Sequence, residues 1–252
     1  MRRPALHVAL AVCLVLAGCS LLGGDPVREA EAVDRLDSVR DRAQTVESYR
    51  YDLSFDVSTT ASGDRVSGTG TGTVNVTTRR AVTNVTVDGA TTRTYLDNRT
   101  AYTQCRTTMP TGFWGEEEIP SERNWTEATP LGRQLALLST GGLYHNGTET
   151  VDGHETVHLT GSPSKDALDA YSDGTSASPV FGGPNVDSVT VDFWVDAATN
   201  RPVQSEVRVV VSGDGETATA TVTTRYRDYG DRVRVTVPAD ARADAFSGGC
   251  PG

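Results

Sequence analysis

The segment from Asp25 to Glu47 has its apolar side chains three or four positions apart, with charged residues filling most of the gaps. The apolar positions are Val33, Leu36, Val39, Ala43 and Val46. This spacing places them on one face of an α-helix. Asp25 suits the N-cap of that helix and Pro26 its first position. The pattern predicts one amphipathic helix that ends near Glu47.

The period of the apolar positions then changes to two. In residues 49–57, the alternate positions are Tyr49, Tyr51, Leu53, Phe55 and Val57, with polar residues between them. Such alternation indicates a strand with one buried face. Turn sequences rich in Gly, Asp and Asn separate further predicted strands at 68–77, 80–88, 92–97 and 100–105, three within 188–230, and a last one at 231–238.

The middle of the chain is less regular. Residues 110–130 read as irregular, and Leu131, Leu135 and Leu138 then share one face of a short helix. A second short helix is expected at 162–172. A long sheet must bury its apolar face, and the helices are the elements available to cover it. We therefore expect an α+β fold, in which a strongly curved antiparallel sheet (an incomplete β-barrel) wraps around the N-terminal helix and the two short helices.

The N-terminus has the features of an export signal. Arg2 and Arg3 precede an apolar run that is too short to span a bilayer comfortably. The sequence Leu16-Ala17-Gly18-Cys19 resembles the lipobox of prokaryotic lipoproteins, which implies that Cys19 carries a lipid. The alternative is an ordinary signal peptide with an incidental cysteine.

If Leu16-Ala17-Gly18-Cys19 is a lipobox, the chain is divided into four parts. Residues 1–18 are expected to be a signal peptide, 19–26 a lipidated tether, 27–246 a single half-barrel domain and 247–252 a tail. The mature protein is then expected to be exported and anchored through its lipid to the outer face of the cytoplasmic membrane.

The formal net charge is −10, and it would be −12 after loss of Arg2 and Arg3. This acidic balance disfavours nucleic acid as a partner. Lys165 is the only lysine. An acidic, lysine-poor surface resembles proteins of salt-loving archaea, although a high genomic GC content would also deplete lysine. The sequence identifies no protein partner and predicts no cofactor.

Besides Cys13 and Cys19, the chain has Cys105 and Cys250. An exported protein can form disulfides, and these two thiols allow one intramolecular pairing. We expect that pairing; the alternative is two free thiols.

Two regions carry a resemblance to a known family. They are "TVESYRYDLSFDVSTT" with "GDRVSGTGTGTVN" after the first helix, and "VDFWVDAATNRPVQSEVRV" with "YRDYGDRVRVTVPAD" near the end. Together they resemble the LolA/LolB-like lipoprotein-carrier superfamily, in particular its LppX/LprG-type branch, and similar lipobox proteins of haloarchaea. The resemblance implies an unclosed β-barrel with an apolar cavity for acyl chains. The resemblance does not identify individual ligand-binding residues in this sequence.

The letters His154-Glu155-Thr156-Val157-His158 match the H-E-x-x-H zinc signature of metallopeptidases. That chemistry needs both histidines on one helical face. Here β-branched residues alternate between flanking glycines, so we expect a strand, on which residues four apart lie ~13 Å apart. We therefore expect no metal site and no catalytic residues. His158 is placed on an exposed face, where its replacement should cost little.

Asn-x-Thr sequons occur at five of the seven asparagines, namely Asn75, Asn84, Asn98, Asn124 and Asn146. On an exported protein they are candidate sites for N-glycans. The acidic run Glu116–Glu118 is either a calcium site or, as we expect, a solvated loop.

Three functions remain after these observations. The first is a non-enzymatic binding protein that holds or carries a lipid or an acyl chain, with Tyr49, Tyr51, Leu53, Phe55 and Val57 facing the cavity. The second is an envelope lipoprotein without a ligand, in which the same face is a filled core. The third is the zinc peptidase, which the strand context disfavours.

Overall fold

The computed structural model describes residues 26–60, 63–105, 113–120, 124–164, 168, 186–213 and 215–250. Its helical segments are α2 (Ala30–Gln44), the 3₁₀ helix η1 (Trp125–Ala128), α3 (Pro130–Leu137) and α5 (Ala239–Ala243). Its strands are β1 (Ser48–Thr59), β2 (Arg65–Asn75), β3 (Arg80–Val87), β4 (Ala90–Asp97), β5 (Thr100–Gln104), β6 (Trp114–Glu118), β7 (Gly142–Val151), β8 (His154–Ser162), β9 (Val186–Asp196), β10 (Pro202–Gly213), β11 (Glu216–Arg227) and β12 (Phe246–Ser247).

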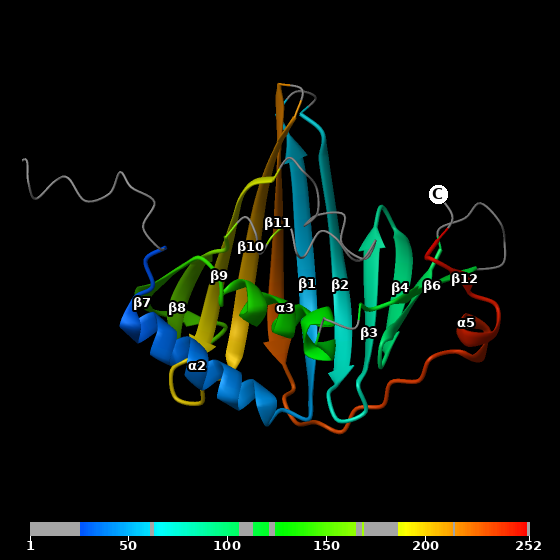
Figure 1. Ribbon diagram of the computed structural model, residues 1–252, viewed down its shortest axis with the longest axis horizontal. Coiled ribbons are helices and arrows are strands. Elements are labelled where there is room, and N and C mark those ends of the chain that lie inside the picture. Colours follow the sequence, from blue (N-terminus) through cyan, green and yellow to red (C-terminus); the bar gives the residue numbers. More distant parts are fainter. Residues whose placement is uncertain are drawn as a thin grey trace, which may run out of the picture.

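These strands form one curved, unclosed sheet in the order β12-β6-β5-β4-β3-β2-β1-β11-β10-β9-β8-β7 (Figure 1). Neighbouring strands are antiparallel except β12, which pairs parallel with β6. The expected α+β half-barrel is therefore confirmed, with the correction that one short parallel strand makes the sheet mixed.

The order of the strands explains where α3 lies. The chain fills one half of the sheet from β1 to β6, and then resumes with β7 at the opposite edge. The segment between β6 and β7 must cross the whole face of the sheet. Helices η1 and α3 belong to that crossing, so they lie over the same face as α2 (Figure 1).

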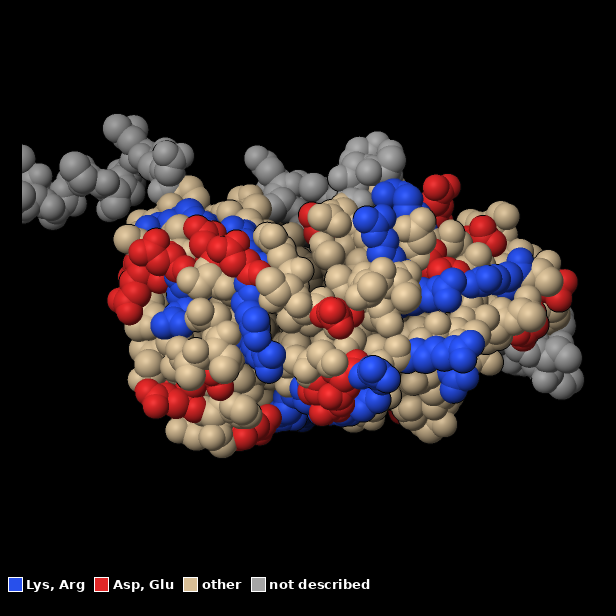
Figure 2. Space-filling model, turned by 90° about the horizontal axis from the view of Figure 1, so that it is seen from below, with Lys and Arg blue, Asp and Glu red and all other residues tan. Residues whose placement is uncertain are grey.

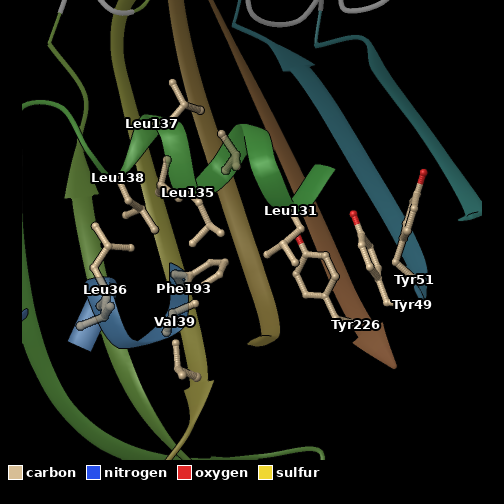
Figure 3. Packing of buried hydrophobic residues seen from close by; sticks show 14 of the residues in the cluster. Leu36, Val39, Tyr49, Tyr51, Leu131, Leu135, Leu137, Leu138, Phe193 and Tyr226 are labelled. Carbon is tan, nitrogen blue, oxygen red and sulfur yellow. The ribbon is translucent and has the colours of Figure 1, made fainter. Parts of the chain in front are cut away.

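The main core lies between this face and the helices. In β1, Tyr49 and Tyr51 are almost completely buried, as their alternation predicts. In α2, Leu36 and Val39 are fully buried, which confirms the apolar face of the predicted helix. Figure 3 shows Leu131 and Leu135 of α3 on the side of the helix that faces these residues. Burying each such side chain stabilises the fold by about 1.5–3 kcal/mol, before the loss of conformational entropy.

The glycine-rich sequence of β2 has a packing role. Gly68, Gly70 and Gly72 are the cross-strand partners of Phe55, Leu53 and Tyr51, in that order. A Cβ on Gly68 would lie 2.5 Å from the Phe55 ring, and one on Gly72 would overlap the Tyr51 ring. Because these positions have no side chain, the side chains of β1 can lie across β2.

A second, smaller core lies on the opposite face of the sheet. It consists of Tyr95, Trp114, Val235, Val237 and Ala241. The C-terminal segment therefore folds back over the outer face, where the Trp114 indole donates a hydrogen bond to Asp240 at 3.1 Å. Residues 231–238 were predicted to be a closing strand, and this is wrong. Val235 and Val237 are packed in this core, while the backbone of residues 231–238 joins no ladder.

Several predicted boundaries also need correction. The first helix begins at Ala30 rather than at Pro26, because residues 27–29 pair with β7: Leu143 N–H donates to Val27 at 3.0 Å, and Glu29 N–H donates to Leu143 at 2.9 Å. The helix ends at Gln44, where the Thr45 hydroxyl donates back to Arg42.

Three elements in the middle of the chain were missed. Residues 110–130 contain β6 and η1, and β7 was not predicted at all. The run Glu116–Glu118 therefore belongs to a strand and not to a loop. The helix expected at 162–172 lies mostly outside the described residues, as does Cys19.

Candidate ligand-binding site

A cavity of about 810 Å³ lies between α2 and the η1–α3 segment. Its lining residues come from three places in the chain: Arg40, Ala43, Gln44, Val46 and Tyr49; Val76; and Asn124, Trp125, Thr126, Glu127, Thr129, Leu131, Gly132, Leu135, Ala136, Ser139 and Thr140. This volume falls in the range of pockets that bind small molecules.

The cavity has an apolar floor and a polar rim. Val46, Tyr49, Trp125, Leu131 and Leu135 are all at least nine-tenths buried and make up the floor. Gln44, Asn124, Thr126 and Ser139 are exposed at the rim. An elongated apolar molecule with a polar end would match this division.

Local sequence fixes the wall that η1 and α3 form. Asn124 caps η1 by accepting a hydrogen bond from Thr126 N–H at 3.2 Å. Thr129 caps α3 by accepting from Gly132 N–H at 3.3 Å, and Pro130 occupies the first helical turn. Gly132 touches the backbone of η1 so closely that a Cβ would overlap Thr126. The two helical segments are therefore tightly joined.

Arg40 links the two walls at the rim. Its guanidinium donates to the Ser139 hydroxyl and, at 3.3 Å, to the Leu135 carbonyl of α3. On its own helix it pairs with Asp37 at 3.2 Å.

On the face of the molecule seen from below, acidic and basic side chains are interspersed (Figure 2).

Four tyrosines lie together beside the cavity floor. The ring of Tyr49 is 6.0–6.3 Å from the rings of Tyr51, Tyr226 and Tyr229. Burial raises the pKa of Tyr51 to about 12 and the pKa of Tyr226 well above its usual range. Burial also raises the pKa of Tyr49, against the opposing effects of nearby Thr129 and the Leu131 backbone. These residues are therefore neutral phenols near neutral pH.

The predicted cavity-face residues of β1 are divided between different places. Tyr49 lines the large cavity. Tyr51 lines a second cavity of about 80 Å³ and bonds the Thr83 hydroxyl at 2.5 Å. Leu53, Phe55 and Val57 are half-buried farther along β1 and line neither.

Sequence reasoning missed the largest side chain of the floor. Trp125 lies in a stretch read as irregular, and its neighbours in η1 contact the solvent. The available signal was the pair of caps, Asn124 and Thr129, that come before an apolar helix.

The H-E-x-x-H sequence is in β8, so its strand assignment is confirmed. Each histidine bonds a different aspartate of β9: His154 Nδ1 lies 3.0 Å from Asp196, and His158 Nε2 lies 2.8 Å from Asp192. In the part of the chain that the structure describes, no group of three or more His, Cys, Asp or Glu side chains could hold a metal ion.

The surroundings of His158 differ from the exposed position expected for it. Its ring stacks on Trp194 with centroids 4.6 Å apart, and its side chain is only 18% exposed. Glu149 of β7 lies 3.4 Å from its other ring nitrogen and accepts the Trp194 N–H at 2.6 Å. His158 therefore ties three strands together on the outer face. Glu155, which shares the alternation of buried Val157, is exposed at the start of the strand.

Cys105 and Cys250 are joined in the structure, with sulfurs 2.11 Å and Cα atoms 5.4 Å apart. The tail then lies directly on β6, where a Cβ on Gly115 would come within 2.5 Å of the Cys250 backbone. This contact holds the C-terminal segment against the edge of the sheet.

The five sequon asparagines are not equivalent in the structure. Asn98, Asn124 and Asn146 are exposed, and Asn98 is in the turn between β4 and β5. Asn75 is half-buried, and its amide nitrogen, the atom a glycan would modify, donates to Val233 at 3.0 Å, whereas that of exposed Asn146 donates to the Thr160 hydroxyl. Asn84 is also half-buried and accepts a hydrogen bond from Arg93.

Comparison with solved structures shows the same fold in a mycobacterial protein. The lipoprotein LppX of Mycobacterium tuberculosis superposes with a TM-score of 0.51 at 13% identity, over 82% of this chain and 100% of LppX. The fold is that of an LppX-like half-barrel. LprF of Mycobacterium bovis matches with a TM-score of 0.46 at 18% identity, over 86% of this chain and 99% of LprF.

A putative outer membrane lipoprotein-sorting protein domain of Vibrio parahaemolyticus matches with a TM-score of 0.33 at 9% identity, over 81% of this chain and 95% of that domain. No protein-family model matches the sequence, and neither does any curated protein. The described helices include none that is long and apolar enough to cross a bilayer.

Proposed function

We propose that this protein binds a hydrophobic ligand, a lipid or the acyl chain of a lipoprotein, in the cavity between α2 and α3. The observation that carries the proposal is the cavity itself, which is large and has an apolar floor. The LppX-like fold supports it, because the sequence resemblance to lipoprotein carriers implies an unclosed barrel with an apolar cavity for acyl chains.

The contrast between floor and rim favours a ligand with a long apolar part. Each Å² of apolar surface that leaves water contributes about 25 cal/mol. The floor offers this burial, whereas the exposed groups of the rim can stay hydrated beside a polar end of the ligand. Arg40 is a cation at the rim that could contact such an end.

The proposal includes an exported protein that is held to the outer face of the cytoplasmic membrane through lipidated Cys19. The described chain begins at Pro26, and Arg28 donates to the Leu138 and Gly141 carbonyls at the end of α3. Pro26 lies seven positions after Cys19, a reach of at most ~25 Å. This short tether would keep the cavity close to the bilayer.

Mass spectrometry of lipids that copurify with the detergent-extracted native protein tests the binding. Ala136→Trp would fill the cavity, because Ala136 is a lining residue of α3. Ser38→Trp is the matched control, because Ser38 is on the exposed side of α2. We expect a lipid to copurify with the wild type and the control, and much less of it with Ala136→Trp.

Equal, trace amounts of lipid in all three preparations would instead support an envelope lipoprotein without a ligand.

We also propose N-glycans at the exposed sequons Asn98, Asn124 and Asn146. Glycopeptide mass spectrometry tests them, and exclusive modification of Asn75 would contradict the structural argument.

A further inference from the structure

The segment Val27–Glu29 lies against the edge strand β7, directly before α2. Leu143 N–H donates to the Val27 carbonyl at 3.0 Å, and Glu29 N–H donates to the Leu143 carbonyl at 2.9 Å. The two segments run parallel at this point. The Glu29 carboxylate adds a bond to β7, because it accepts from His145 N–H at 2.8 Å. Val27–Glu29 thus forms a short strap along the edge of the sheet.

The middle residue of this strap holds the end of α3. The Arg28 guanidinium donates to the Leu138 carbonyl at 3.3 Å and to the Gly141 carbonyl at 3.0 Å. Carbonyls at the C-terminus of a helix have no partner within the helix, and an arginine can supply one. Ser139 and Thr140 lie between these two carbonyls in the chain, and both line the cavity. Arg28 therefore fixes the part of the cavity wall where α3 ends.

The strap is held mainly by polar contacts. Val27 is 61% exposed, and Glu29 is exposed as well. Burial of apolar side chains is the main source of stability in a folded protein, so a segment that buries few of them can detach while the rest stays folded. The following helix α2 is different, because Leu36 and Val39 hold it in the main core. Detachment of the strap therefore leaves α2 in place.

We infer that the strap controls how fast a ligand leaves the cavity. When the strap is paired with β7, Arg28 holds the end of α3 and the cavity wall is firm. When it detaches, Arg28 is withdrawn, the wall loosens and the ligand exchanges faster. This inference rests on the proposed function and deepens it, because it concerns regulation of the same cavity. The residue that discriminates is Glu29, whose carboxylate bonds β7 rather than α3.

Release of a pyrene-labelled fatty acid tests the inference. The purified native protein is loaded with the probe and mixed rapidly with an excess of phosphatidylcholine vesicles, which take up the released probe. Arg28→Ala should raise the release rate about tenfold, because hydrogen bonds from a charged group are lost. Glu29→Ala should raise it at least about threefold, although Glu29 is remote from the cavity wall. Both variants should change the Kd of the probe less than the release rate, because a loosened wall also speeds entry.

Glu31→Ala is the matched control. Glu31 is exposed in the first turn of α2, so its replacement removes the same negative charge beside the same helix N-terminus while the strap stays intact. It should change the release rate by less than about twofold. In the probe-free protein, amide hydrogen exchange of residues 135–140 should become faster in Arg28→Ala and Glu29→Ala, and stay unchanged in Glu31→Ala.

Faster release from Arg28→Ala with an unchanged rate for Glu29→Ala would overturn the inference, and would leave Arg28 as a local cap of α3. Unchanged release from both strap variants, or equal acceleration by Glu29→Ala and Glu31→Ala, would also overturn it. So would a Kd that rises as much as the release rate, because binding itself would then be impaired. Failure of the wild type to bind the probe would overturn the proposed function, and this inference with it.

Discussion

Tyr51 of β1 lies directly opposite Gly72 of β2, and its ring occupies the space that a side chain at Gly72 would need. The ring thus crosses β2, and its hydroxyl reaches Thr83 of β3. One missing side chain on β2 therefore lets a buried residue of β1 bond the third strand. The same relationship recurs at Gly70 and Gly68, which makes the glycine row a packing feature of the sheet.

The first prediction concerns this row. Gly72→Ala should destabilise the protein by about 1–3 kcal/mol, because the new methyl group overlaps the Tyr51 ring and forces it to move. Urea denaturation measures the change. Thr71→Ala is the control, because Thr71 is exposed on the other face, and it should cost less than about 1 kcal/mol. Equal effects of the two substitutions would contradict the packing role.

The disulfide gives the second prediction. It closes a loop between residues 145 positions apart, so the entropy model assigns it about 5 kcal/mol of stability. Cys105→Ser with Cys250→Ser should lower the denaturation midpoint by a corresponding amount. Alkylation of the unreduced, denatured protein should leave both cysteines unlabelled. Labelling of both would show that the two thiols are free.

The anchor gives the third prediction. Cys19→Ser should abolish membrane retention, so that the protein accumulates as an uncleaved precursor or is released into the medium. Fractionation followed by intact-mass measurement distinguishes these forms. A fully processed Cys19→Ser variant that stays in the membrane fraction would refute the lipidated tether.

The periodic parts of the sequence predicted the fold well. The helix of Leu36 and Val39 and the strand of Tyr49 and Tyr51 each bury one continuous apolar face, and their period reports that face directly. The same reasoning failed for residues 231–238. Their valines alternate in the same way but pack on the outer face of the sheet without pairing, and alternation alone cannot separate these two cases.

The candidate site was predicted only in part. Tyr49 was found because it belongs to a long alternating strand. Trp125 and Leu135 reach the cavity because the chain must cross from one edge of the sheet to the other between β6 and β7. That requirement depends on the order of the strands, which local patterns do not contain.

The buried tyrosines give the fourth prediction, which concerns alkaline pH. Burial raises the pKa of Tyr51 to about 12, above its ordinary value of 10.0, and also raises the pKa values of Tyr226 and Tyr229 well above that ordinary value. The fold thus favours the neutral phenol. Its stabilising effect is complete below about pH 10 and is lost as the pH rises from 10 toward 12.

Absorbance titration at high pH measures this effect. In the folded protein, the buried tyrosines should ionise only together with unfolding, whereas all eight tyrosines should ionise near pH 10 in denaturant. The denaturation midpoint should fall over the same interval. Ionisation of every tyrosine near pH 10 while the fold persists would show that the cluster is open to water.

The last prediction concerns His158. Because its ring stacks on Trp194 and bonds Asp192, His158→Ala should cost about 1–2 kcal/mol, more than an exposed substitution usually does. His158→Phe keeps a ring for stacking but loses the bond to Asp192, so it should cost part of that amount. Glu155→Gln should change stability by less than about 0.5 kcal/mol, because Glu155 is exposed.

Metal analysis of the same three variants separates this structural role from the zinc reading of H-E-x-x-H. A zinc site would bind one equivalent of metal that His158→Ala releases, and Glu155→Gln would then abolish activity without affecting stability. The strand geometry predicts the opposite result. His158→Ala should lower stability with no metal to release, because its imidazole bonds an aspartate of β9 and lies beside a glutamate of β7, and so holds neighbouring strands together.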